Sequence, residues 1–374
     1  MPKKIYVIAG EASGDLHGAN LIRHLKAEAS APLEIYGVGG ERIRQTGALN
    51  FFDLAHFHVT GMTEALRRLP QYWNAAAVVL KGIREAQPDA VVLIDNPGFN
   101  LHLAQKIHAL GIPIVYYIAP QVWAWAPKRI LKIKKFISKV LVVFEFEKKI
   151  YEKEGIPVSW VGHPLKDLIG KEFPEPTKKN GDFQICLLPG SRKGELKHLM
   201  KVFLGAAALL KKKFETASFV LIRSSALPKA FYERLLKQAP IPVRLAEENA
   251  YSEIKASALA IACSGTVTLE CALLETPMVI ANKSTFLTYA LAKRLIRVPY
   301  LGLPNLVLGQ KKFPELLQYD ATPEKIAEEA TRIISEPAVR ESMKRDLKEV
   351  SGRIGEPGAT RRAALEILQI LQNG

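Results

Sequence analysis

Short apolar runs alternate with longer segments of helical periodicity along the first part of the chain. The apolar runs predict buried strands at residues 5–9, 33–38, 90–94, 114–118 and 140–144. The segments between them predict helices at residues 19–29, 62–86, 101–110 and 128–136. Continuously apolar strands that alternate with helices are typical of a parallel sheet covered on both faces. This part of the chain is therefore predicted to be a doubly wound α/β domain.

The same alternation returns after residues 166–182, whose Lys, Glu, Pro and Gly content is typical of a linker. Strands are predicted at residues 183–188, 218–222, 243–245, 259–262 and 278–281, and helices at 197–214, 229–238, 269–274 and 324–334. The sequence thus predicts two Rossmann-like domains, at 1–165 and 183–350, joined by the linker 166–182. A C-terminal helical tail at 351–374 is expected to pack on the first domain or on a partner chain. Two doubly wound domains facing a cleft make up the glycosyltransferase-B type of α/β fold, which other two-Rossmann enzymes share.

Composition and charge narrow the class of protein further. The chain of 374 residues is 48% hydrophobic and 24% charged, which excludes a disordered or collagen-like protein. Its three cysteines fit neither a disulfide framework nor a metal site. The net charge of +15 favours a polyanionic partner, but it is spread over both halves, unlike a nucleic-acid-binding stripe. No apolar stretch approaches the ~18 residues of a membrane span, so membrane contact is expected to be peripheral.

Two loops of the first half follow predicted strands and carry polar residues. In the loop at 10–15, glycines would let backbone amides approach a ligand, although a tight turn capped by Ser13 or Asp15 explains the pattern equally well. Asp95 directly follows the strand at 90–94, where a carboxylate could act as general base toward a hydroxyl. A turn or cap role before Pro97 is the simpler alternative.

Two loops of the second half are candidates for phosphate binding. The loop at 188–192 combines a Gly-Ser turn with the guanidinium of Arg192, which suits phosphate unless it is an ordinary surface arginine. The loop at 263–270 places three hydroxyls and a glycine at a helix start, which favours a diphosphate site over simple capping, since capping needs one hydroxyl. Glu270, about one turn into that helix, could accept hydrogen bonds from ribose hydroxyls.

Aromatic and basic residues indicate two further candidate surfaces. Trp123 and Trp125 lie in a proline-bounded loop, where one could stack on a sugar or cover an acyl chain and the other pack in the core. The predicted helix at 62–86 carries basic residues beside leucines and aromatics, as membrane-surface helices do, although most such helices are ordinary scaffold helices with a solvated face.

Several of these loops together resemble lipid A disaccharide synthase, a family of bacterial inverting glycosyltransferases. The matching motifs occur in family order: AGEASGD (9–15), GVGG (37–40), IDNPGFN (94–100), PQVWAW (120–125), FEKKIY (146–151), VGHPL (161–165), PGSR (189–192), SGTVTLE (264–270), LPN (303–305) and PELLQ (314–318). Each motif alone is weak, but the whole ordered set is specific.

The resemblance implies a reaction and its substrates. UDP-2,3-diacylglucosamine would be the donor and 2,3-diacylglucosamine 1-phosphate the acceptor. The products would be a β-1′,6-linked lipid A disaccharide 1-phosphate and UDP, formed with inversion. The family works in the cytoplasm, peripherally on the inner membrane, and can form homodimers by exchanging C-terminal segments. No cofactor, metal ion or nucleic acid is expected.

The resemblance also assigns residues to roles. Asp95 matches the proposed catalytic base. The remaining assignments are UDP binding by Gly190, Ser191, Arg192, Ser264, Gly265, Thr266, Glu270 and Asn305, an acceptor-side loop of Gly10, Glu11, Ser13, Gly14 and Asp15, and membrane or acyl contact by Leu66, Arg67, Arg68, Leu69 and Trp73.

Alternative interpretations stay open on the sequence. His17 and His163 are rival bases. Another enzyme of the same fold, such as a UDP-N-acetylglucosamine transferase of cell-wall synthesis or an epimerase, would need a different acceptor or none. A non-enzymatic polyanion-binding protein would instead show salt-sensitive nucleic-acid binding.

Overall fold

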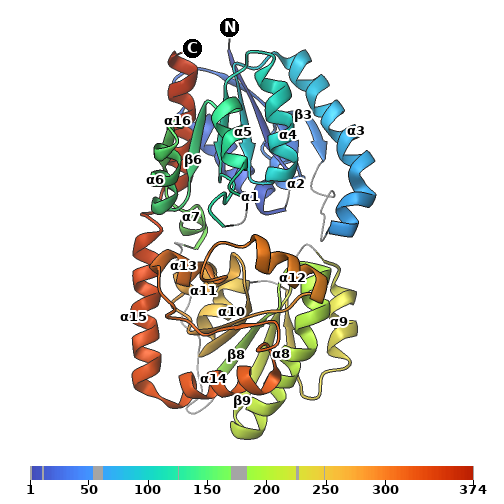
Figure 1. The fold of residues 1–374 in the computed structure, drawn as a ribbon, viewed down its shortest axis with the longest axis vertical. Helices are drawn as coiled ribbons and strands as arrows, with labels where there is room; N and C mark the ends of the chain where they lie inside the picture. Colours follow the sequence, from blue (N-terminus) through green and yellow to red (C-terminus); the bar gives the residue numbers. More distant parts are fainter. Residues whose placement is uncertain are drawn as a thin grey trace. The chain divides into compact units, whose positions relative to one another are not determined.

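The computed structural model describes residues 2–10, 12–53, 62–124, 126–169, 183–224, 227–247 and 249–373. Contacts divide the chain into two compact units: unit 1 is Met1–Asp167 with Ile354–Gly374, and unit 2 is Leu168–Arg353. Each is a parallel sheet flanked by helices (Figure 1). The prediction of two doubly wound α/β halves is therefore confirmed. Glu11, Trp125 and most of the predicted linker, residues 170–182, lie outside the described residues.

Unit 1 is built on a seven-stranded parallel sheet in the order β3-β2-β1-β4-β5-β6-β7. The strands are β1 (Lys3–Ala9), β2 (Leu33–Gly39), β3 (Leu49–Asp53), β4 (Ala90–Ile94), β5 (Ile114–Tyr117), β6 (Lys139–Val142) and β7 (Val158–Trp160). Its helices are α1 (Ala12–Glu28), α2 (Glu41–Arg44), α3 (Met62–Ala86), α4 (Pro97–His108), α5 (Arg129–Phe136), α6 (Glu145–Lys153) and α16 (Ala359–Asn373), with α7 (Leu165–Ile169) at the unit boundary.

The core of unit 1 forms two layers, one on each face of this sheet. Helices α3 to α6 contribute to one apolar cluster, while α1, α2 and α16 contribute to the other. Figure 1 shows α4 and α5 side by side over the sheet, and their residues pack against each other. Tyr116 belongs to the first cluster and Tyr117 to the second, because successive side chains of a strand point to opposite faces. The fully apolar strands of the sequence are thus covered on both sides.

The last helix of the chain, α16, packs in unit 1. Ala363, Ala364 and Ile367 are buried in the cluster that includes α1. The carboxylate of Asp167 accepts hydrogen bonds from three backbone N–H groups at the start of α16, those of residues 358, 359 and 360, at 2.6, 3.1 and 2.8 Å. These bonds satisfy amides that have no partner inside the helix.

Unit 2 has a six-stranded parallel sheet in the order β10-β9-β8-β11-β12-β13. The strands are β8 (Phe183–Leu188), β9 (Ala217–Ile222), β10 (Arg244–Ala246), β11 (Leu259–Cys263), β12 (Met278–Asn282) and β13 (Glu315–Leu317). Its helices are α8 (Lys193–Lys213), α9 (Lys229–Leu236), α10 (Ala250–Ala256), α11 (Val267–Leu273), α12 (Phe286–Leu295), α13 (Leu303–Leu308), α14 (Pro323–Ser335) and α15 (Pro337–Arg353).

The first helix begins earlier than its periodicity predicts. Helix α1 starts at Ala12 rather than at residue 19, so the predicted loop at 10–15 is mostly helix. Gly18 lies where α1 packs closely on a neighbour. A Cβ atom on Gly18 would lie 2.7 Å from Cδ1 of Ile43, whereas one on Gly14 would make only an ordinary contact, at 3.5 Å from Cβ of Ala9. Gly18 therefore marks close packing of the helix.

Candidate functional site

In each sheet, successive strands are added first toward one edge and then toward the other, so the strand order has one switch point. In unit 1 the switch point lies between β1 and β4, and in unit 2 it lies between β8 and β11. Ligands of open parallel sheets bind beyond the carboxyl ends of the strands at such a point. The four loops that carry most of the predicted polar residues follow these four strands. Within each unit, therefore, the structure pairs two predicted loops at the place where a ligand is expected.

In unit 1 the two loops touch. A Cβ atom on Gly10, after β1, would collide with the side-chain amide of Asn96, after β4. Gly10 is therefore required by the close approach of the two loops. Ser13 is exposed on the first turn of α1, while Gly14 is buried beneath it.

Asp15 has a structural role in unit 1. Its carboxylate accepts backbone hydrogen bonds from Gly40 and Ile43 at 2.7 and 3.0 Å through Oδ1 and from Arg42 at 3.1 Å through Oδ2. These residues form the start of α2, so Asp15 caps that helix and not its own. The residue is 95% buried and these contacts use both carboxylate oxygens, so Asp15 does not act as a ligand of the acceptor loop.

Asp95 occupies a sharp bend between β4 and α4. Its φ is 48°, and Asn96 follows with a φ of 41°. Left-handed backbone costs free energy for any residue with a Cβ atom, although less for Asp and Asn than for other types, so two such residues in succession carry some strain. Such strain concentrates at functional sites, where the surrounding structure maintains it. This bend presents the Asp95 side chain at the switch point of unit 1.

Three groups hold the backbone at this bend. The N–H of Asp95 donates to the carbonyl of Tyr117 at 3.2 Å, which continues the sheet. The carbonyl of Asp95 accepts from Oη of Tyr116 and from Nδ2 of Asn100, both at 2.7 Å. Burial, with a smaller contribution from Asp95, raises the pKa of Tyr116 well above its usual value, so the phenol stays protonated and donates.

The tryptophan loop is anchored to α6. Trp123 donates its indole N–H to Glu147 at 2.9 Å, and Tyr151 donates its hydroxyl to the carbonyl of Pro120 at 2.9 Å. The ring of Trp123 also meets Phe146 edge-on, with 5.0 Å between centroids. Trp123 is therefore the packing member of the tryptophan pair, and Trp125 lies outside the described residues.

Both rival histidines are buried in unit 1. Burial lowers the pKa of His17 to about 4, and burial together with His17 lowers the pKa of His163 to about 3. Nδ1 of His163 accepts a hydrogen bond from the backbone N–H of Leu165 at 3.2 Å. Each residue is 93% buried, whereas Asp95 is partly exposed.

In unit 2 the Gly-Ser-Arg loop is already capped by the protein. Oε2 of Glu195 accepts the backbone N–H groups of Ser191 and Arg192 at 3.0 and 3.2 Å. The Arg192 guanidinium is more than half exposed and lies 3.4 Å from Oε1 of Glu195. Gly190 has a φ of 107°, and a Cβ atom there would lie 3.1 Å from Sγ of Cys263. A phosphate could thus meet the Arg192 side chain, whereas Glu195 occupies the amides of this loop.

The neighbouring loop after β11 has a different hydrogen-bond pattern. Ser264 donates its hydroxyl to the carbonyl of Leu301 at 2.7 Å, so this proton is committed. Gly265 has a φ of 155° with open space where a Cβ atom would lie, and Thr266 is exposed. Burial raises the pKa of Glu270 to about 7, because the ionised carboxylate is poorly solvated there. Hydroxyl groups of a ligand could replace the missing solvation by donating hydrogen bonds to it.

Asn305 is part of the scaffold behind this loop. Its amide donates to Glu315 at 2.7 Å and to the carbonyl of Phe313 at 2.9 Å, and its oxygen accepts the N–H groups of Lys312 and Phe313. Glu315 in turn accepts the backbone N–H groups of Leu301 and Gly302 at 2.9 and 3.0 Å. Asn305 is fully buried, so it orders the segment that holds Ser264 and does not reach a ligand itself.

Sequence reasoning missed the side chains that hold these loops. Tyr116, Asn100 and Glu195 bond to the backbone of a predicted loop, and Glu315 bonds to the backbone of Leu301, the partner of Ser264. For Asn100 there was a signal, because an asparagine on an otherwise apolar helix face predicts a buried polar contact. Tyr116 gave none, since tyrosine is common in strands.

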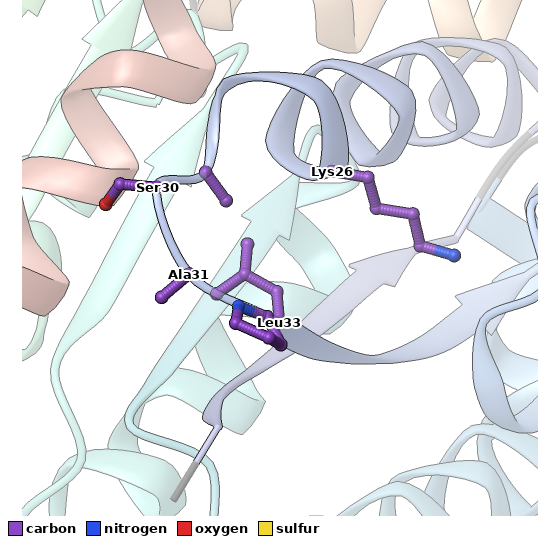
Figure 2. Close-up of a pocket in the computed structure, with 6 residues that line it drawn as sticks. Lys26, Ser30, Ala31 and Leu33 are labelled. Atoms are coloured by element: carbon purple, nitrogen blue, oxygen red, sulfur yellow. The ribbon is translucent and has the colours of Figure 1, made fainter.

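Other parts of the described structure offer no competing site. The hollow in Figure 2 is lined by residues at the end of α1 and the start of β2, at the amino edge of the sheet. Its one charged residue, Lys26, donates to the carbonyl of Thr46 at 2.8 Å. Within the ranges that the structure describes, no cluster of His, Cys, Asp and Glu could hold a metal ion.

The predicted membrane residues lie on α3, whose bounds match the predicted helix. The side chains of Leu66, Arg67, Arg68, Leu69 and Trp73 lie outside the described part of the chain. No helix among the described residues has the length and hydropathy needed to cross a bilayer.

Comparison with known proteins gives matches over almost the whole chain. The sequence model of the family described as Lipid-A-disaccharide synthetase matches residues 5–366. The lipid-A-disaccharide synthase of Trichlorobacter lovleyi is 37% identical over 380 residues, covering 99% of this chain and 98% of the relative. That of Geobacter metallireducens is 36% identical over 379 residues, covering 99% and 97%.

Solved structures give the same fold. The S. aureus MnaA–UDP co-structure has a TM-score of 0.71 at 13% identity and covers 99% of this chain and 97% of its own. The UDP-GlcNAc 2-epimerase from Neisseria meningitidis bound to UDP-GlcNAc has a TM-score of 0.66 at 15% identity and covers 98% and 100%. At such identities the likeness establishes the fold alone.

Proposed function

Because the chain belongs to the lipid-A-disaccharide synthase family, we propose that it joins UDP-2,3-diacylglucosamine to 2,3-diacylglucosamine 1-phosphate. Family membership makes it a glycosyltransferase of lipid A biosynthesis with sugar-nucleotide and lipid-sugar phosphate substrates, in agreement with the resemblance of its motifs. The residue roles that follow are part of the proposal.

The reaction is a single displacement at the anomeric carbon of the donor. The acceptor 6-hydroxyl forms the new carbon–oxygen bond as the bond to the UDP phosphate breaks, which inverts the centre. Asp95 takes the hydroxyl proton, and UDP leaves with the electron pair. A carboxylate is a weak base for an alcohol, so the proton moves late, when bond formation has made the hydroxyl acidic.

Unit 2 is assigned the nucleotide. The Arg192 guanidinium and the loop at 264–266 would stabilise the negative charge that develops on the leaving diphosphate. Glu270 would accept hydrogen bonds from the ribose hydroxyls, which would relieve the desolvation that raises its pKa. In unit 1, the loop beside Gly10 would border the acceptor.

The observation that carries these assignments is the position of Asp95. It directly follows β4 at the switch point of unit 1, on a strained backbone that buried side chains maintain. A simple turn needs neither the strain nor the two buried donors.

Replacement of the carboxylate tests the assignment. Asp95→Asn should abolish formation of disaccharide 1-phosphate and UDP while UDP affinity changes less than about threefold. The matched control is Asp89→Asn, at the opposite end of β4, where the carboxylate bonds to Lys3 and the backbone of Lys4. Weakened UDP binding with residual turnover in Asp95→Asn would reject the assignment. Turnover of the UDP-sugar with no acceptor present would favour an epimerase.

We also propose that α3 lies on the cytoplasmic surface of the inner membrane and that the chain forms a homodimer. The basic and apolar residues of α3 support the first part, since such a helix binds anionic lipid. The protein should cosediment with vesicles that contain phosphatidylglycerol, and the double variant Arg67→Glu/Arg68→Glu should lose this binding.

The proposed homodimer is tested by the molar mass in solution, which should be twice that of one chain.

A further inference from the structure

Two buried side chains from different elements hold the carbonyl of Asp95. Tyr116 on β5 and Asn100 on α4 each donate a hydrogen bond to this oxygen at 2.7 Å. A carbonyl oxygen has two lone pairs, so the two bonds satisfy it completely. Asn100 also donates to the carbonyl of Ile94 at 3.1 Å and therefore spans the last two carbonyls before the bend. Both side chains are fully buried.

These contacts act on the one peptide that the sheet does not hold. The peptide before Asp95 is fixed, because its N–H donates to the carbonyl of Tyr117 at 3.2 Å. The peptide after Asp95 lies beyond the strand, between two left-handed residues. Fixing its carbonyl oxygen restrains φ and ψ of Asp95, and φ sets the direction in which the Cα–Cβ bond leaves the backbone. Without donors from outside the bend, this peptide could relax toward ordinary backbone angles.

We propose that Tyr116 and Asn100 are positioning residues that fix the peptide after Asp95 and so aim its carboxylate at the acceptor hydroxyl. The inference rests on the proposed role of Asp95 as the base. A role in stability alone would be met by one donor to this carbonyl. The second donor restricts the rotation of the peptide plane, which matters for the direction of a reacting group.

Tyrosine 117 offers a closely matched control for Tyr116. It is the next residue of the same strand, equally buried, and belongs to the apolar cluster on the opposite face of the sheet. Tyr116→Phe and Tyr117→Phe each remove one buried hydroxyl and keep the ring. Only the first removes a hydrogen bond to the carbonyl of Asp95.

The measurement separates turnover from binding and folding. Tyr116→Phe should lower kcat roughly tenfold or more, because a displacement of ~1 Å at a reacting group can cost ~100-fold. KM for both substrates should stay within about twofold, and Tyr116→Phe should remain folded at the assay temperature, because one buried hydrogen bond contributes only about 1 kcal/mol. The proposal is wrong if the two variants have similar kcat values, or if Tyr116→Phe raises KM as much as it lowers kcat.

A second pair of variants shows whether the effect passes through Asp95. In Asp95→Glu the carboxylate is already displaced, so adding Tyr116→Phe should cost less than it costs the natural enzyme. An equal cost in both backgrounds would show that Tyr116 acts elsewhere. If Tyr116→Phe does not fold, Asn100→Ser is measured in the same way. Full turnover by Asp95→Asn would instead overturn the proposed role of Asp95 as the base, on which this inference rests.

Discussion

Replacing the buried carboxylate of Glu147 with an amide should change how unit 1 responds to pH. Glu147 is 1% exposed, and burial raises its pKa to about 7 from an ordinary 4.5. This difference in pKa corresponds to about 3 kcal/mol. Because the folded protein holds the proton more tightly than the unfolded chain does, the contribution of Glu147 to stability is largest below pH 4.5. The contribution of Glu147 is lost as the pH rises through the folded pKa near 7.

The variant Glu147→Gln should be less stable than the natural protein at low pH and more stable at high pH. Its amide oxygen can still accept the indole N–H of Trp123, but its NH₂ group would face the backbone N–H of Phe144. That mismatch should cost about 1–2 kcal/mol at pH 5. At pH 8 the variant should be the more stable protein, because no charge has to form in the buried site.

Tryptophan fluorescence during urea unfolding measures this effect in unit 1 alone. Trp73, Trp123, Trp125 and Trp160 all belong to unit 1. The difference in unfolding free energy between the natural protein and Glu147→Gln should fall by about 3 kcal/mol from pH 4.5 to 8. The two buried histidines also make stability depend on pH, in the opposite direction. They are the same in both proteins, so their effect cancels when one unfolding free energy is subtracted from the other. Glu145→Gln, an exposed position on the same helix, is the control. A flat difference curve for Glu147→Gln would refute the reasoning.

Two further substitutions test the scaffold of each unit. Asp167→Ala should destabilise unit 1 by about 2 kcal/mol in the same fluorescence assay, because three N–H groups at the start of α16 lose a charged acceptor. Equal stability would mean that water replaces the cap. Glu315→Gln should weaken UDP binding roughly tenfold by calorimetry, since its NH₂ group would oppose one of the N–H groups that position Leu301 and Gly302. Glu324→Gln, an exposed position on α14, should bind UDP normally.

Most of the fold could be predicted from the sequence because the central strands are buried on both faces. Such strands are continuous apolar runs, and β4 and β8 have the predicted bounds. Elements with weaker patterns were missed. The strands β7 and β13 have three residues each, too few for a period to appear. Helix α15 buries only Met343, Leu347 and Val350 among 17 residues, so its apolar stripe is narrow.

The sequence predicts which residues follow the central strands and so lie at the candidate site. It does not predict the hydrogen-bond partners that come from elsewhere in the chain. Asp15 and Asp95 look alike in the sequence, since each follows a buried strand within a few residues. They differ in what reaches them. Asp15 meets three N–H groups from 25 to 28 residues away, which use its carboxylate for capping. At Asp95, Tyr116 from 21 residues away and the nearby Asn100 bind the backbone carbonyl, and the bend that they hold carries the side chain. Local patterns specify which residues lie at the edge of a sheet, whereas tertiary hydrogen bonds decide which of them can act on a ligand.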